Sequence, residues 1–146
     1  MMETVVVAFD ESEPAERALA RASDLAEAFD ATLVVVAVAE APLPGSGIDV
    51  LPGAPERLAD GATEEFDLAE RHLQQARRLL EGRAVRAEFV ADVGEPTERI
   101  LTLADERSAD VIVVGIEEAG FLERLLERSV GEDVPHRTRR DVLIVH

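Results

Sequence analysis

The sequence predicts a doubly wound α/β fold, in which a five-stranded parallel sheet is flanked by helices on both faces. Uninterrupted runs of β-branched and other apolar residues occur at positions 4–10, 32–39 and 111–114, as is typical of strands buried on both faces. Stretches in which apolar residues recur at helical spacing separate these runs. The two patterns alternate along the chain, so we expect residues 1–146 to form a single domain.

The first strand–helix–strand unit is expected between Thr4 and Ala39. Residues 4–10 form its first strand and residues 32–39 its second. Between them, Ser12 can cap a helix that starts at Glu13, and Pro14 is tolerated in the first turn. The helical positions expected to face the sheet are Ala15, Ala18, Leu19, Ala22, Leu25, Ala26 and Phe29.

A long surface loop and a second helix are expected next. Residues 40–60 contain several prolines and glycines, which predicts a loop. Helical periodicity returns over residues 62–81, and Gly82 suits the end of that helix. Apolar and charged residues then alternate over residues 85–89, which is typical of a partly exposed edge strand. The apolar positions of the second helix are Ala62, Phe66, Ala69, Leu73, Ala76 and Leu80.

The last part of the chain predicts two further strands and two helices. Residues 94–96 open a third helix, and residues 110–115 form the fourth strand. Ser129 is a possible start for a fourth helix, although Pro135 should break or kink it. Residues 142–145 form the final strand.

The chain is strongly acidic. Thirty-one acidic residues against fifteen basic ones give a net charge of −16, and every basic residue is an arginine. One interpretation is a halophilic protein, adapted to a cytoplasm in which ~1 M salt screens charges within ~3 Å. The alternative is an ordinary acidic protein encoded by a GC-rich genome. Either protein repels nucleic-acid backbones, so we expect no nucleic-acid partner.

The composition also limits location and chemistry. No apolar run approaches the ~20 residues that a membrane span requires, and no leader pattern precedes Thr4, so we expect a cytoplasmic protein without membrane contact. The absence of cysteine excludes disulfides and thiol catalysis. The scattered histidines, His72, His136 and His146, predict solvated or capping roles and no metal site. Adjacent acids such as Glu117 and Glu118 do not define a catalytic pair, so no catalytic residue is predicted.

A ligand site is predicted where the first and fourth strands end. In doubly wound sheets these strands can be neighbours across the point where the strand order reverses, and ligands bind beyond their carboxyl ends. Asp10 follows the first strand and Gly115 ends the fourth. An aspartate there can accept hydrogen bonds from a sugar or a base amine; a turn-forming or capping role is the alternative.

Several segments together resemble the universal stress protein family over essentially the whole chain. They are Val-Val-Val-Ala-Phe-Asp-Glu-Ser-Glu at residues 5–13, Gly-Glu-Pro at 94–96, Ala-Asp-Val-Ile-Val-Val-Gly at 109–115 and Val-Leu-Ile-Val at 142–145. The resemblance implies the adenine nucleotide alpha hydrolase-like version of the fold. It also implies a homodimer that pairs through the last strand, residues 141–145, and a family divided into ATP-binding and non-binding members.

The phosphate loop that the resemblance implies departs from the pattern of ATP-binding members. That pattern is Gly, two residues, Gly, nine residues, Gly, then Ser or Thr. Counted from Gly115, the later positions are Glu118, Arg128 and Ser129, so both later glycines are replaced. The positions that correspond to adenine and ribose contacts are Asp10 and Val38.

The two replacements oppose ATP binding. A Cβ in a phosphate loop takes up space and restricts the backbone. At ~4 Å and an effective dielectric constant near 20, the negative charge of Glu118 opposes a phosphate by up to ~4 kcal/mol. Arg128 acts in the opposite direction, because guanidinium groups suit phosphate oxygens. Magnesium could also bridge Glu118 to phosphates, so ATP with magnesium stays an alternative to a site without a cofactor.

The sequence therefore favours a homodimeric binding or regulatory module with weak or no ATP binding. Two alternatives stay open. The first is an ATP binder or slow ATPase that uses Asp10, Val38, Gly115 and Ser129 with magnesium. The second is a purely structural protein whose crevice is filled by Glu118 and Arg128. The basic cluster at residues 137–140 suggests either an anion contact or pairing with the acidic surface.

Overall fold

The computed structural model describes residues 1–40, 55–115, 123 and 140–146, and for residues 55–63 it describes the backbone alone. Within this part of the chain the elements follow in the order β1 (Thr4–Ala8), α1 (Glu13–Phe29), β2 (Thr32–Ala39), α2 (Pro55–Leu79), β3 (Arg86–Val93), α3 (Pro96–Glu106), β4 (Val111–Gly115) and β5 (Asp141–Val145).

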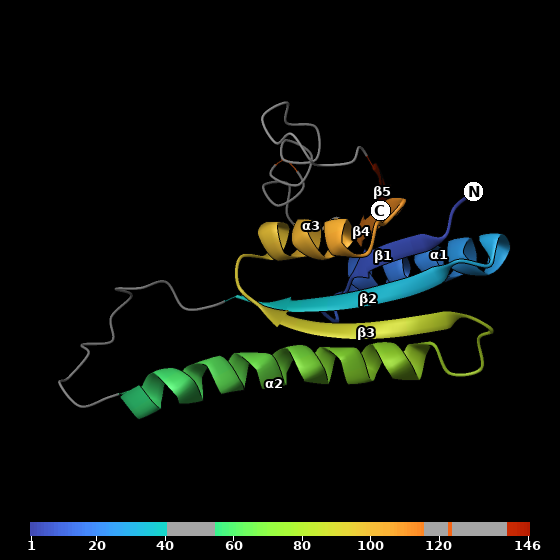
Figure 1. Cartoon of the computed structure of the whole chain (residues 1–146). Coiled ribbons are helices and arrows are strands. Elements are labelled where there is room, and N and C mark those ends of the chain that lie inside the picture. The colour runs from blue at the N-terminus through green and yellow to red at the C-terminus, as the bar shows by residue number, and fades with distance from the viewer. Residues whose placement is uncertain (41–54, 116–122, 124–139) are drawn as a thin grey trace.

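The five described strands form one parallel sheet in the order β3-β2-β1-β4-β5 (Figure 1). β1 pairs with β2 on one side and with β4 on the other, so the strand order reverses at β1. This arrangement confirms the predicted α/β class and the predicted pairing of the first and fourth strands. β3 lies at one edge of the sheet, as its alternating pattern predicts.

Two apolar clusters lie on opposite faces of the sheet, because successive side chains of a strand point in opposite directions. On one face, Val5 and Val7 pack under α1 and α2. On the other face, Val6 and Ile112 pack under α3. The inner strands are thus covered on both sides, which explains why their sequences read as unbroken apolar runs.

The ends of α1 follow from local sequence. Ser12 has extended backbone angles, and its Oγ accepts a hydrogen bond from the Ala15 amide at 3.2 Å. This confirms the predicted N-cap and the predicted start at Glu13. The helix ends at Asp30, whose φ of 54° lies in the left-handed region that terminates many helices.

The prediction for the start of α2 is wrong. Residues 40–60 were expected to form a loop, but the helix already begins at Pro55. Proline suits the first turn of a helix, because the amide that it lacks is not needed there. Pro55 therefore marks the start of α2, although it was interpreted as part of a loop. The remainder of the predicted loop, residues 41–54, lies outside the described residues. Gly82, with φ of 80°, follows the end of α2 as expected.

Phe29, which was predicted to face the sheet, and Phe66, a predicted apolar position of the second helix, are both exposed. Phe29 is 47% exposed and Phe66 is 44% exposed. Phe29 is the last residue of α1. The 25 residues of α2 extend ~37 Å, whereas the 8 residues of β3 extend only ~26 Å, so the first turns of α2 project beyond the strand (Figure 1). Helical periodicity identifies the face of a helix that is apolar, but not the length of sheet available to cover it.

Asp110 joins the beginnings of β1 and β4. Its Oδ2 accepts hydrogen bonds from the amides of Glu3 at 2.7 Å and Thr4 at 3.0 Å. These two backbone hydrogen bonds hold the pKa of the Asp110 carboxyl below its ordinary value of 3.8. The ionised carboxylate therefore stabilises the folded chain.

Replacing Asp110 with asparagine should lower the stability at neutral pH by about 1 kcal/mol, because a neutral amide oxygen is a weaker acceptor for the two amides. The folded-state pKa is the lower one, so the contribution of the carboxylate is complete above the unfolded-state pKa. It is lost as the pH falls through the folded-state pKa. Urea denaturation of both proteins from neutral to acidic pH measures this difference.

Asp141→Asn is the matched control, because the Asp141 carboxylate accepts no hydrogen bond from the described residues. A stability difference between the parent and Asp110→Asn that is constant down to acidic pH would contradict the role given to this carboxylate.

Candidate functional site

Three adjacent strands bring the predicted binding residues to one edge of the sheet. Phe9 N donates to Val36 O at 2.9 Å, so pairing with β2 continues just beyond the end of β1. Asp10 follows directly, and Val38 lies two residues after Val36 near the end of β2. Gly115 ends β4 on the other side of β1. The fold therefore places Asp10, Val38 and Gly115 at the same carboxyl edge, where the strand order reverses.

Asp10 forms the turn that leads into α1. Its Oδ1 accepts hydrogen bonds from the amide of Ser12 at 3.1 Å and from the hydroxyl of Ser12 at 2.6 Å. Between them, Glu11 has a φ of 66°, which is uncommon for a residue other than glycine. The turn-forming alternative is thus correct for Oδ1. Oδ2 accepts no hydrogen bond from any described residue and is available to a ligand.

Val38 and Gly115 are both built into the packing of the fold. Val38 is half-buried against the cluster beneath α3. Gly115 lies against the first turn of α1, where a Cβ would overlap the carbonyl group of Pro14 and lie 2.8 Å from the nitrogen of Ala15. Real Cβ atoms do not approach backbone so closely. Only glycine fits at this point, whether or not a ligand binds beside it.

A contact from α2 reaches the same turn, and sequence reasoning did not identify it. His72 Nδ1 lies 3.0 Å from Glu11 Oε2, close enough for an ion pair when the imidazole is protonated, but not aligned as a hydrogen bond. The His72 side chain is only 18% exposed, so the prediction of a solvated or capping role is wrong. The available signal was its position, three residues after buried Ala69 on the same side of the helix.

The beginning of α3 lies at the carboxyl end of β3 and adds polar groups. Glu95 caps the helix by accepting a hydrogen bond from the Glu98 amide at 2.7 Å. Asp92 Oδ2 pairs with Arg99 Nε at 2.7 Å, which raises the pKa of the arginine. Thr97 is fully buried, and its hydroxyl has no hydrogen-bond partner among the described residues. No sequence pattern distinguished Thr97 from an ordinary residue in the first turn of a helix.

The predicted phosphate-loop residues Glu118, Arg128 and Ser129 lie outside the described residues, as do Pro135 and the expected fourth helix. Of the basic cluster at residues 137–140, only Arg140 is described. Its side chain is 3% exposed and pairs with Asp105 of α3. For Arg140, this pairing favours the acidic-surface interpretation over an anion contact.

The described part of the site can accept hydrogen bonds but supplies little to bind an anion. The oxygens of Asp10 and Glu11 are acceptors at pH 7, and the first turn of α1 donates one amide to Ser12. These groups suit the hydroxyl or amine groups of a ligand better than its phosphates. No helix among the described residues is long and apolar enough to cross a membrane.

Replacing Gly115 with alanine should destabilise the protein by about 1–3 kcal/mol or more, because the new Cβ meets backbone that cannot move aside easily. Gly82→Ala is the control: its Cβ would meet nothing within 4 Å, so it bears only the conformational cost of a positive φ, roughly 1 kcal/mol. Denaturation midpoints compare the two variants. A loss in Gly115→Ala no larger than in Gly82→Ala would mean that the turn relaxes.

Known proteins resemble this chain along its whole length. The profile described as "Universal stress protein family" matches residues 1–146. Universal stress protein Rv1636 of Mycobacterium tuberculosis is 33% identical over 98% of this chain and 95% of its own length. Stress response protein NhaX of Bacillus subtilis is 29% identical, with coverage of 97% and 96%. A universal stress protein solved in complex with cAMP superimposes with a TM-score of 0.64 at 28% identity, covering 99% of this chain and 97% of that one. The chain belongs to the universal stress protein family.

Proposed function

We propose that this protein is a cytoplasmic regulatory or binding module, with weak or no ATP binding and no catalytic activity. The observation that carries this proposal is the sequence after β4. Glu118 and Arg128 stand at two positions where ATP-binding relatives have glycine. Both side chains add bulk at positions where a polyphosphate needs bare amide donors, and Glu118 adds a negative charge that the guanidinium of Arg128 can offset.

The nucleoside end of the site supports a ligand better than the phosphate end. Asp10 Oδ2 makes no hydrogen bond within the described part of the chain, and Val38 offers a half-buried apolar side chain on the neighbouring strand. Together they suit a purine and its sugar. At the phosphate end, Gly115 already packs on α1, and the charges of Asp10 and Glu11 lie nearby.

ATP binding is the second candidate function. A relative of 28% identity was solved in complex with cAMP, so an adenine nucleotide is a reasonable ligand to test. If ATP binds, Asp10 and Val38 would contact adenosine, and Gly115 and Ser129 would contact phosphate. Magnesium would supply positive charge between Glu118 and the phosphates.

We also propose a homodimer that forms through β5, because the two edges of the sheet differ in their protection. β3 carries Arg86, Glu88 and Asp92, and charged side chains discourage edge-to-edge pairing. β5 is apolar from Val142 to Val145, and its Leu143 is 38% exposed. Pairing with a second copy would cover this edge.

The parent protein should bind ATP with magnesium at least about tenfold more weakly than a Glu118→Gly, Arg128→Gly double variant. The variant restores two glycines and removes one acid from the phosphate loop. Calorimetric titration at molar potassium chloride measures both affinities, and titration with adenosine alone tests the nucleoside end separately.

Micromolar binding of ATP to the parent would overturn the proposal and favour the ATP-binding alternative. Equal weak binding by parent and double variant, with circular dichroism showing both folded, would mean that the two side chains do not limit the site.

Sedimentation at high salt should show a dimer for the parent and a monomer for Leu143→Lys, because a charge on each β5 opposes its twofold mate. Leu68→Lys is the matched control, since Leu68 is 40% exposed but lies on α2, away from β5. A monomeric parent, or a dimer that both variants leave intact, would exclude pairing through β5.

A further inference from the structure

A groove of about 410 Å³ lies between α1 and the end of α2, a volume within the ~300–1,000 Å³ range of ligand pockets. Leu79, at the end of α2, is 40% exposed there. We call this feature the α1–α2 groove. Its apolar lining is Leu19, Ala20, Leu79 and Leu80, and its polar lining is Glu13, Glu16, Arg17 and Arg83.

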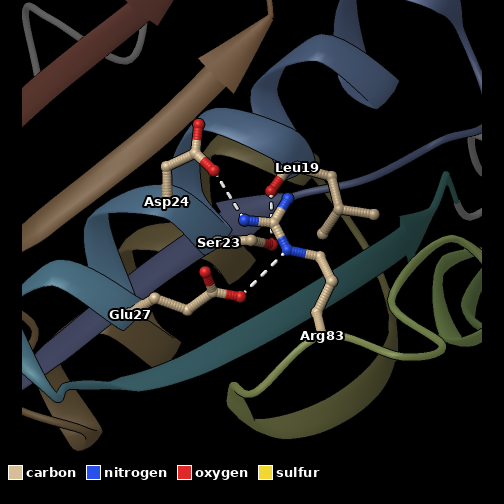
Figure 2. Close-up of polar contacts among 5 residues, drawn as sticks. All are labelled: Leu19, Ser23, Asp24, Glu27 and Arg83. Atoms are coloured by element: carbon tan, nitrogen blue, oxygen red, sulfur yellow. Dashed lines mark hydrogen bonds and ion pairs between the residues drawn. The ribbon is translucent and has the colours of Figure 1, made fainter.

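Arg83 lies at one end of the groove, and its guanidinium is already paired with carboxylates of α1. It reaches from the segment after α2 to α1, where Nη2 lies 2.5 Å from Asp24 Oδ1 and Nε lies 3.0 Å from Glu27 Oε1 (Figure 2). The hydrogen bonds to Glu27 and Asp24 raise the pKa of the guanidinium further above its ordinary value. Beyond the groove, the contact between His72 and Glu11 again joins α2 to the start of α1. The walls are therefore positioned before any partner arrives, which limits the ordering cost of binding.

Arg17, the second arginine of the lining, also has partners within the chain. Arg17 Nε donates to the backbone oxygen of His146 at 3.0 Å, and its Nη1 lies 3.8 Å from Glu13 Oε2. The Glu16 carboxylate, by contrast, makes no hydrogen bond or ion pair with any described residue. The lining carries two glutamates and two arginines, and both arginines are paired with carboxylates, so the Glu16 carboxylate is the lining charge left for an incoming molecule.

We infer that the α1–α2 groove docks a basic amphipathic segment of a partner protein, with an aliphatic side chain against Leu79 and Ala20 and a lysine or arginine at Glu16. The apolar lining accounts for the aliphatic anchor, because covering an exposed leucine removes apolar surface from water. The unpaired Glu16 accounts for the basic residue. The same charges disfavour acidic peptides and phosphate-bearing ligands.

The overall charge of the chain acts in the same direction. A net charge of −16 attracts cationic partners over distances limited by the salt concentration. Such attraction is not specific to one place on the surface. The experiment must therefore distinguish docking in the groove from general attraction to an acidic protein.

The probe is a fluorescein-labelled peptide of about 14 leucine and lysine residues, ~four helical turns, with leucines along one face. Binding is measured by fluorescence anisotropy at the lowest salt concentration at which circular dichroism shows the protein folded. The parent should bind this peptide and should not bind a peptide in which glutamate replaces lysine.

Leu79→Glu distinguishes docking in the groove from general electrostatic attraction. The substitution removes the apolar contact with the peptide while adding negative charge. Docking in the groove predicts an affinity at least about tenfold lower, as for the loss of a central anchor. Leu68→Glu is the matched control, because Leu68 has the same 40% exposure and lies three turns earlier on α2, outside the groove. Its affinity should stay within about twofold of the parent.

Ala20→Leu gives a second variant that keeps the charge and the helix propensity and fills the groove; it should also weaken binding. Unchanged or tighter binding by both groove variants would overturn the proposal, as would failure of the parent to bind the basic peptide. Neither result bears on ATP, because the groove and the candidate nucleotide site share no residue.

Discussion

The close approach of β4 to the first turn of α1 is the constraint on which the candidate site depends. Gly115 has no side chain, so the Pro14 carbonyl and the Ala15 amide can lie directly against it. The approach fixes the start of α1, which Ser12 caps, and Ser12 in turn holds Oδ1 of Asp10. A bulkier residue at position 115 would displace the whole turn. The backbone at the switch point is therefore positioned by packing, whether or not a ligand binds there.

Charge is the second determinant of what this protein can bind. Several described arginines pair with carboxylates of the same chain, among them Arg83 with Asp24 and Glu27, and Arg99 with Asp92. Acidic residues outnumber arginines in the chain, whose net charge is −16. Such a charge repels polyanions and attracts basic partners. The proposed weak ATP binding and the proposed basic protein partner both rest on this excess of acidic charge.

Much of the fold could be predicted because buried parallel strands have a distinctive sequence. The bounds of β2 match the predicted residues 32–39, and Ser12 caps α1 as expected. Predictions failed where local sequence serves two purposes. Pro55 suggested a loop but starts α2, and Phe66 has helical spacing but is 44% exposed. The burial of His72 could be expected from its spacing to Ala69, but its partner Glu11 could not, because the two residues lie far apart in sequence and Glu11 has a positive φ. Glu118, Arg128 and Ser129 stay predictions.

The glycine that the chain retains, Gly115, and the two glycines that it lacks differ in what they indicate about ATP binding. Gly115 is required by the fold, since a Cβ there would overlap the backbone of α1 with or without a nucleotide. Its presence therefore says nothing about binding. Val38 likewise packs under α3, and half of the Asp10 carboxylate is used by its own turn. The predicted contacts Glu118, Arg128 and Ser129 lie outside the described residues, and at positions 118 and 128 this chain has a charged side chain. The proposed weak ATP binding therefore rests on Glu118 and Arg128, and the presence of Gly115 cannot be set against it.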